Sequence, residues 1–298
     1  MQNVLTLITD PARADISPRH VEAVSAALVA AGAEIAVVDW LDEGTACDVV
    51  FTGPSLETAR RSVLDAIAAP NFDIAVQSRQ GRRKDLLVID MDSTVVSGET
   101  LDELADRTKV KDAVAEITAR AMAGDLQFAA ALRERVTLLA GLGTDAMVET
   151  AAAVRLNPGA RTLVATMRAH GAYTVLVSGG FKFITSHVAL VVGFDADEAN
   201  RLEVVDGSLT GRIVEPILDP VAKLAALHRH ARDHNIPLAE TLAAGDGAND
   251  LAMIQGAGLG VAYHAKPILR EAAAVRIDHG DLTALLYLQG YRGREFTL

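Results

Sequence analysis

Two aspartates separated by one residue follow a short apolar run in the first third of the chain. Residues 86–89 read Leu-Leu-Val-Ile, and Asp90 and Asp92 come directly after them. A carboxylate held against a divalent cation can attack phosphorus, and a second carboxyl group beside it can give a proton to the departing alkoxide. We therefore interpret Asp90 as a nucleophile and Asp92 as a general acid and base. The expected intermediate is a covalent aspartyl-phosphate.

Further polar residues follow later apolar runs. Ser178, Gly179 and Gly180 come after residues 173–177, and Gly-Asp-Gly-Ala-Asn-Asp occupies residues 245–250. A lone cation, Lys223, lies in the first turn of an expected helix. Carboxylates, one cation, a hydroxyl and backbone amides freed by glycine suit a phosphate bound with a hard divalent cation. The sequence therefore predicts Mg²⁺ as cofactor, with Lys223 and the Ser178 hydroxyl neutralising the phosphoryl oxygens.

The apolar runs before these residues predict a parallel sheet. From residue 85 onward, short strands alternate with helices, which is typical of a doubly wound, Rossmann-like α/β fold. Ligands of such open sheets bind beyond the carboxyl ends of the strands, where the polar residues fall. The expected strands are residues 86–89, 173–177, 241–244, 259–262 and 275–277.

About seventy residues separate the first two of these strands, far more than a simple crossover needs. Residues 96–156 therefore predict an inserted helical cap. Asn157 before Pro158, and Asp219 before Pro220, each offer a helix N-cap followed by a proline in the first turn. Residues 202–214 predict a hairpin, with Asp-Gly at its turn.

Residues 1–80 predict a separate small unit, and residues 78–85 read as a polar, basic linker to residues 85–298. Strands and helices alternate in the order βαββαβ, which is the order of ferredoxin-like α+β modules. The expected strands are residues 4–8, 35–40, 48–51 and 72–77, and the expected helices are residues 18–31 and 55–68.

Composition narrows the class of ligand. The chain has 28 basic and 39 acidic residues and a formal charge of −11, which gives no basic footprint for nucleic acid or an anionic membrane. No apolar run approaches the ~20 residues of a membrane helix, and no secretory signal is evident, so we expect a cytoplasmic protein with a small-molecule substrate. Cys47 is the only cysteine, which excludes an internal disulfide.

These residues resemble the phosphoserine phosphatases of the haloacid dehalogenase superfamily. Asp-Met-Asp-Ser-Thr at residues 90–94 is similar to the DxDx(T/V) motif, and residues 245–253 are similar to the acidic metal motif. The resemblance covers residues 85–298 and implies a Mg²⁺-dependent hydrolysis of O-phospho-L-serine to L-serine and phosphate, the last step of serine biosynthesis. The family's order of functional residues is matched by Glu99, Phe128, Arg135, Ser178, Gly179, Lys223, Asp246, Asn249 and Asp250.

The resemblance also implies roles for the acidic residues. Asp90 and Asp246 would bind the metal through their side chains, and Asp92 would bind it through its backbone carbonyl. Asp250 would support the metal shell, and Asn249 would contact the phosphate region.

The cap offers a separate indication of the substrate. Phe128, Leu132, Arg135 and Leu139 follow the spacing of one helix face, which places Arg135 on an apolar stripe. Arg135 could bind a substrate carboxylate, Glu99 could bind a substrate ammonium group, and Phe128 could exclude water. Two alternatives stay open: Arg135 could pair with Glu134 or Glu103, and Glu99 could simply favour the helix dipole.

Other functions are also compatible with the sequence. A related phosphatase or phosphotransferase could act on phosphothreonine or phosphohomoserine, which carry the same zwitterion. A phosphoacceptor signalling module would share the acidic residues, the lysine and Mg²⁺, but it would not need a cap. The N-terminal unit resembles ACT regulatory domains, which predicts either amino-acid feedback or a dimerisation or stabilising role, with a homodimer among the assemblies it allows.

Overall fold

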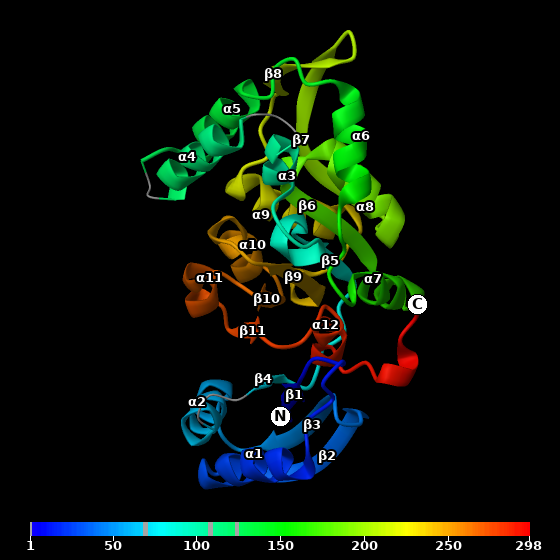
Figure 1. Ribbon diagram of the computed structural model, residues 1–298. Helices are drawn as coiled ribbons and strands as arrows, with labels where there is room; N and C mark the ends of the chain where they lie inside the picture. Colours follow the sequence, from blue (N-terminus) through cyan, green and yellow to red (C-terminus); the bar gives the residue numbers. More distant parts are fainter. Residues whose placement is uncertain (1, 68–70, 107–109, 123–124) are drawn as a thin grey trace.

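The computed structural model describes residues 2–67, 71–106, 110–122 and 125–298. Figure 1 shows an N-terminal unit at the bottom, a larger sheet with its helices in the middle and the cap helices at the top. The C-terminal segment, drawn in red, lies between the N-terminal unit and the larger sheet. Within the described residues, no helix is long and apolar enough to cross a membrane.

The larger sheet confirms the predicted doubly wound architecture. It has seven strands in the order β11-β10-β9-β5-β6-β7-β8, and all neighbours are parallel except β7 and β8. The first strand, β5, lies near the middle, which places the residues after it at the centre of one sheet edge. The strands are β5 (Leu86–Ile89), β6 (Tyr173–Phe181), β7 (Ala196–Val205), β8 (Ser208–Val214), β9 (Thr241–Gly245), β10 (Leu259–Tyr263) and β11 (Val275–Ile277).

The expected hairpin at residues 202–214 is longer than predicted. Its first strand, β7, begins at Ala196 and pairs in parallel with β6, so the hairpin extends the main sheet. Most residues of β7 are only half-buried. Because a strand of this kind has no continuous apolar run, its first half gave no signal in the sequence.

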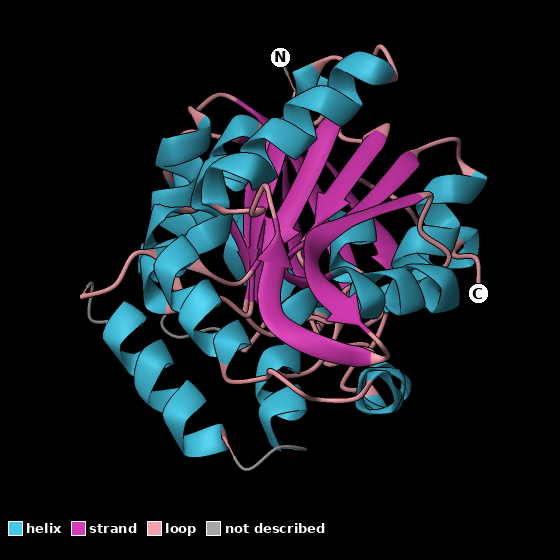
Figure 2. Cartoon of the chain, turned by 90° about the horizontal axis from the view of Figure 1, so that it is seen from above, coloured by secondary structure: helices cyan, strands magenta, loops and turns pink. Residues whose placement is uncertain are grey.

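Helices cover both faces of the sheet, as the view from above shows (Figure 2). The side chains of β5 alternate between the faces: Leu87 and Ile89 belong to one apolar cluster, and Leu86 and Val88 belong to the other. The first face packs against α7 (Ala160–Ala169), α8 (Lys182–Val192) and α12 (Ala284–Leu288), and the second packs against α9 (Pro220–Asp233), α10 (Leu251–Gly256) and α11 (Pro267–Ala272).

Four of the described helices between β5 and β6 occupy the region expected to form the cap, and α7 follows them. They share a small core that includes Leu104, Leu132 and Leu139 and reaches Phe181 of β6. The expected cap also contains residues 107–109 and 123–124, which lie outside the described residues. The helices are α3 (Thr100–Asp106), α4 (Lys111–Met122), α5 (Phe128–Thr137) and α6 (Thr144–Ala153).

The prediction that Asn157 caps a helix is wrong. Helix α7 begins only at Ala160, with Gly159 as its N-cap, because the Asn157 side chain has another partner. Its Nδ2 donates to the carbonyl of Thr94 at 2.7 Å, and Val96 forms an antiparallel bridge with Leu156. Asn157 therefore ties the two chain connections of the cap together. The prediction for Asp219 is confirmed, since its side chain accepts from Ala222 N at 2.9 Å.

The N-terminal unit has a four-stranded antiparallel sheet in the order β2-β3-β1-β4. Leu5 and Leu7 of β1 face the two helices of the unit. On the other face, Ile8 joins the apolar cluster that contains Tyr287 of α12, so the unit shares a core with the rest of the chain. The elements are β1 (Asn3–Ile8), α1 (Pro18–Ala30), β2 (Glu34–Asp42), β3 (Ala46–Thr52), α2 (Leu56–Ala66) and β4 (Asp73–Ser78); residue 68 of the expected second helix lies outside the described residues.

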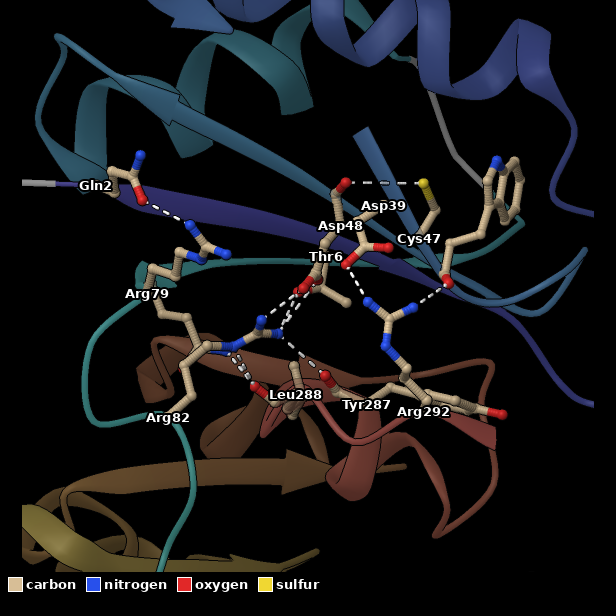
Figure 3. Close-up of polar contacts among 12 residues, drawn as sticks. Gln2, Thr6, Asp39, Cys47, Asp48, Arg79, Arg82, Tyr287, Leu288 and Arg292 are labelled. Carbon is tan, nitrogen blue, oxygen red and sulfur yellow. Dashed lines mark hydrogen bonds and ion pairs between the residues drawn. The ribbon is translucent and has the colours of Figure 1, made fainter. Parts of the chain in front are cut away.

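A buried arginine joins the N-terminal unit to the C-terminal segment (Figure 3). Arg82 pairs with Asp48 of β3 at 2.5 Å, and the two side chains are only 9% and 6% exposed. The same guanidinium donates to Thr6 Oγ1 and to the carbonyls of Tyr287 and Leu288. The Arg82 guanidinium thus has acceptors around it and the Asp48 carboxylate has a donor, as buried charged groups require.

We expect Arg82→Met to lower the free energy of unfolding by about 3 kcal/mol, because the Asp48 carboxylate would stay buried without its partner. Urea unfolding measures this change. Arg79→Met is the matched control, because Arg79 makes one exposed hydrogen bond, to Gln2, and its loss should cost under about 0.5 kcal/mol. Equal losses in the two variants would contradict the prediction.

Candidate active site

The predicted residues meet at the carboxyl edge of the larger sheet. Asp90 follows β5, Ser178 lies in the last part of β6, and Asp246 follows β9. Lys223 comes from the first turn of α9, whose N-cap is Asp219. Asp90 and Lys223 are buried, at 3% and 1% exposure. The alternation of strand and helix therefore brings distant segments to one place.

Three buried carboxylates gather around this point. One oxygen from each of Asp90, Asp246 and Asp250 lies within 4.8 Å of the others. A set of carboxylate oxygens alone suits a hard divalent cation. The side chain of Asp92 is not part of this set, and the role of its backbone carbonyl as a metal ligand stays a prediction.

Lys223 lies between two of the carboxylates. Its Nζ is 2.7 Å from Asp90 Oδ1 and 2.6 Å from Asp250 Oδ1. Burial and the Asp250 carboxylate raise the pKa of Asp90, while Lys223 opposes this shift. Burial by itself lowers the pKa of Lys223, but the Asp90 and Asp250 carboxylates outweigh it and raise the pKa overall. Lys223 is therefore a fixed cation beside the expected nucleophile.

Gly245, the last residue of β9, is required by the closeness of Asp250. A Cβ atom at residue 245 would lie 2.5 Å from Asp250 Oδ2 and 2.7 Å from Asp250 Cβ. Both distances are too short for any real side chain. The glycine at the start of the acidic loop thus allows Asp250 to reach the carboxylate set.

We expect Gly245→Ala to weaken the binding of a divalent cation, tested with Mg²⁺, by at least about tenfold, because the new methyl group would displace Asp250. Titration calorimetry on metal-stripped protein measures this affinity. Gly143→Ala is the matched control, since a Cβ there would meet nothing within 4 Å. An unchanged affinity in Gly245→Ala would show that Asp250 does not support the metal.

Asp92 is held by partners from two sides. Its Oδ1 accepts from the backbone N–H of Thr100 at 2.9 Å, and its Oδ2 accepts from Ser178 Oγ at 3.2 Å. Burial raises the pKa of Asp92 to about 6, and the nearby Glu99 carboxylate adds to the effect. A carboxyl group with this pKa can donate a proton near neutral pH and take one back.

The raised pKa of Asp92 predicts a pH-dependent stability. Between pH 3.8 and about 6 the folded chain keeps the Asp92 proton that the unfolded chain has lost, so the contribution to stability is present at low pH and is lost as pH rises through 6. In metal-free protein, the free energy of unfolding of the wild type should therefore fall by up to about 2 kcal/mol as pH rises, a figure reduced for the partial exposure of Asp92. Asp92→Asn should remove this fall. Urea unfolding at several pH values measures it, with Asp65→Asn of α2 as control. Parallel curves for wild type and Asp92→Asn would contradict the prediction.

The cap places an aromatic ring over the glycine loop. The Cζ atom of Phe128 would lie 3.1 Å from a Cβ on Gly179. Leu132 of α5 is buried in the cap core and Phe128 packs against it, but the helix ends at Thr137, so Leu139 joins this core from the segment after α5. Phe128 therefore covers the site beside Ser178 and Gly179.

Arg135 has no carboxylate partner among the described residues. Its guanidinium donates weakly to the Ala131 carbonyl at 3.3 Å and to Thr118 Oγ1 at 3.5 Å. The predicted alternative partner Glu134 pairs instead with Arg120, at 3.2 Å. Burial lowers the pKa of Arg135, while the carboxylates of Asp102 and Glu99 oppose this shift. A half-buried guanidinium in this position can accept an anionic ligand.

Glu99 directly precedes α3, and its partners come from outside the four cap helices, from the loop after Asp92 and the loop after β10. Glu99 Oε1 accepts from Ser93 Oγ at 3.1 Å and lies 3.4 Å from Lys266 Nζ. Lys266 also lies 3.1 Å from Asp246 Oδ2. Lys266 and Asp102 were not predicted as site residues. Lys266 carried one signal that could have identified it: it follows the β10 strand end by three residues.

Asn249 is half-buried beside the carboxylate set. Its Oδ1 lies close to Gly247, where a Cβ would collide with it, and the Gly247 N–H donates to Asp250 Oδ2 at 3.1 Å. Met91, the residue between the two aspartates, is fully buried in an apolar cluster of the larger sheet, so its side chain points away from the site.

Comparisons with known proteins agree with this geometry. A family model described as haloacid dehalogenase-like hydrolase matches residues 87–255. The chain is 42% identical over 253 residues to a protein named phosphoserine phosphatase from Streptomyces coelicolor, which covers 84% of this chain. A protein of the same name from Streptococcus thermophilus is 44% identical over 199 residues, which cover 67% of this chain and 93% of the relative.

A solved structure resembles almost the whole chain. The probable phosphoserine phosphatase from Vibrio cholerae, in its unliganded form, aligns with a TM-score of 0.78 at 28% identity and covers 98% of this chain and 88% of its own. The sequence match with the Streptomyces relative spans only 62% of that relative's length.

Proposed function

Because the chain belongs to the haloacid dehalogenase-like hydrolase family, we propose that it is a Mg²⁺-dependent phosphatase that hydrolyses O-phospho-L-serine to L-serine and phosphate. The observation that carries the substrate assignment is Arg135, a half-buried guanidinium without a carboxylate partner among the described residues. A simple phosphomonoester would give this cation nothing to bind, whereas an amino-acid phosphate supplies a carboxylate.

Asp90 attacks phosphorus in this proposal, and the serine oxygen leaves with the proton of Asp92. Lys223 stays beside Asp90 and neutralises charge on the phosphoryl oxygens, together with the Ser178 hydroxyl. Asp92 then removes a proton from the water that attacks the aspartyl-phosphate, which releases phosphate and regenerates Asp90. The pKa of Asp92, about 6, supports both directions of proton transfer.

The oxygen ligands of Asp90, Asp246 and Asp250 fit Mg²⁺, with the backbone carbonyl of Asp92 as a further ligand. Bound there, the cation supplies charge neutralisation for the phosphoryl group and keeps Asp90 ionised. Asn249, at the mouth of the carboxylate set, contacts the phosphate.

Substrate recognition divides between the two ends of the zwitterion. Arg135 binds the carboxylate and Glu99 binds the ammonium group, displacing Lys266 from one of its two partners. Phe128 closes the site over Gly179, which favours a small substrate over the bulkier phosphothreonine. Closure of this kind excludes water while the aspartyl-phosphate forms.

The N-terminal unit, residues 1–80, is in this proposal an ACT-like module with a stabilising role. The core that Ile8 shares with Tyr287, and the ion pair of Arg82 with Asp48, support this role. A homodimer stays a prediction.

Phosphate release from a substrate panel tests the proposal. The panel contains O-phospho-L-serine, O-phospho-L-threonine, phosphohomoserine, a sugar phosphate and p-nitrophenyl phosphate, each with Mg²⁺ or with EDTA. A preference for phosphoserine that EDTA abolishes is the expected result. Turnover of the aryl phosphate alone would support the role of Asp90 as nucleophile but contradict the assignment of phosphoserine as substrate. No turnover of any compound would favour a phosphoacceptor signalling module.

A further inference from the structure

Two buried side-chain oxygens, Thr94 Oγ1 and Thr100 Oγ1, have no hydrogen-bond partner among the residues that the structure describes. Thr100 is the first residue of the cap helix α3 and is only 1% exposed. A buried polar group without a partner is costly, so in a folded protein such a group calls for an explanation. The surroundings of the Thr100 hydroxyl indicate a functional one.

The Thr100 hydroxyl lies beside Asp92 and Ser178. A Cβ atom on Gly180 would lie 3.0 Å from both Asp92 Oδ2 and Ser178 Oγ, and Thr100 Oγ1 is 3.6 Å from the same point. Burial and the Glu99 carboxylate raise the pKa of Asp92, whereas the nearby Thr100 hydroxyl opposes the rise. The backbone N–H of Thr100 already donates to Asp92 Oδ1 at 2.9 Å. The main chain and the hydroxyl of one residue are therefore both next to the same carboxyl group.

The other donor to Asp92 has a second use. The Ser178 hydroxyl donates to Asp92 Oδ2 at 3.2 Å and accepts from the Gly180 N–H at 2.8 Å. A serine hydroxyl has only one hydrogen to donate. In the proposed mechanism the same hydroxyl neutralises the phosphoryl oxygens of the substrate. Ser178 cannot donate to Asp92 and to a bound phosphoryl group at the same time.

This conflict arises at the chemical step. As the bond from phosphorus to Asp90 forms and the bond to the serine oxygen breaks, the proton of Asp92 moves to that oxygen. Asp92 is then a half-buried carboxylate, and a charged group in such a place needs hydrogen-bond donors. Once Ser178 has turned to the phosphoryl group, the Thr100 N–H is the donor that Asp92 keeps.

We propose that Thr100 is a positioning residue for Asp92: its hydroxyl replaces Ser178 as a donor to the Asp92 carboxylate when Ser178 donates to the phosphoryl group. This inference rests on the proposed phosphatase function. It accounts for the buried hydroxyl without a partner, because that hydroxyl is held ready for the step in which Asp92 loses its proton. It also gives the cap a part in the chemistry, since Asp92 has its full set of donors only when the start of α3 lies against it.

Three variants test this role. Thr100→Val removes the hydroxyl but keeps the branched shape of the side chain and the N–H that donates to Asp92. Thr100→Ser keeps a hydroxyl at the same position. Thr150→Val is the matched control, because Thr150 is a fully buried threonine of the cap whose hydroxyl already donates to the Ala146 carbonyl at 2.7 Å.

The kcat/KM values for p-methoxyphenyl and p-nitrophenyl phosphate isolate the step in which Asp92 acts as an acid. Neither compound has the carboxylate or ammonium group of phosphoserine, so recognition by the cap does not enter the comparison. Nitrophenolate leaves without a proton, whereas the poorer methoxyphenolate depends on Asp92. In Thr100→Val, kcat/KM should fall by at least about tenfold for p-methoxyphenyl phosphate and O-phospho-L-serine, and by less than about threefold for p-nitrophenyl phosphate. Thr100→Ser and Thr150→Val should stay within about threefold of the wild type on all three.

Urea unfolding separates this role from a purely structural one. Because Thr100→Val removes a buried hydroxyl that has no partner, its unfolding midpoint should equal or exceed that of the wild type. A lower midpoint with equal losses on all three substrates would make Thr100 a structural residue and overturn the inference. Unchanged kcat/KM values in Thr100→Val would also overturn it and would leave the phosphatase function intact. A wild type without activity on any of the phosphates would overturn both.

Discussion

Asp90→Asn is expected to lower phosphate release from O-phospho-L-serine by at least about 10⁴-fold. An asparagine amide has the shape of the carboxylate but cannot attack phosphorus, so the covalent step is lost, together with the ion pair to Lys223 and one anionic ligand of the carboxylate set. The amide oxygen can still accept the Met91 N–H, which the Asp90 carboxylate accepts at 2.8 Å. Release of inorganic phosphate under saturating substrate and Mg²⁺ measures the change.

The matched control is Asp85→Asn, at the opposite end of the same strand. Asp85 is exposed, and its backbone N–H, which the substitution keeps, donates to the Glu240 carbonyl. Asp85→Asn should keep full activity. Acid-quenched wild type should carry one phosphoryl group, detected by mass, whereas Asp90→Asn should carry none. A loss of under tenfold in Asp90→Asn would show that another group attacks the substrate.

Arg135→Met is expected to lower kcat/KM for O-phospho-L-serine by about 10³-fold while changing that for p-nitrophenyl phosphate by less than about threefold. The guanidinium would no longer pair with the substrate carboxylate, which the aryl phosphate lacks. Methionine keeps the length and apolar stem of the side chain, so the stripe of α5 that buries Leu132 stays filled.

Arg133→Met separates this effect from a general loss of charge in the cap. Arg133 lies on the same helix, is exposed and pairs with Glu215 at 2.6 Å, so its removal should leave both substrates unaffected. Equal decreases in kcat/KM for both substrates in Arg135→Met would mean that Arg135 stabilises the cap and does not bind the substrate carboxylate.

Much of the site followed from local patterns in the sequence. Asp90, Ser178 and Asp246 each stand at the end of an apolar strand, and parallel strands place such residues at one edge. The close approach of Asp250 to Gly245 is also local, since only four residues lie between them. Patterns of this kind need no knowledge of distant partners.

Predictions that depended on neighbours outside the local pattern were less complete. Asparagine is a common N-cap residue, but the Asn157 side chain donates instead to the Thr94 carbonyl. The first half of β7 lies beside β6 with half-buried residues, which gave no apolar run. The contact of Ile8 with Tyr287 could not be inferred, because the two residues lie at opposite ends of the chain and no local pattern relates them.

The sequence by itself therefore determined the fold class and which polar residues follow the strands, because strand and helix periodicity and loop glycines are local properties. Only the tertiary structure decided which charges are paired. It left Arg135 without a carboxylate partner among the described residues, and it joined Glu99 to Lys266 across 167 positions of the chain. Such pairings depend on which side chains folding brings within hydrogen-bond distance, and no spacing along the chain encodes that.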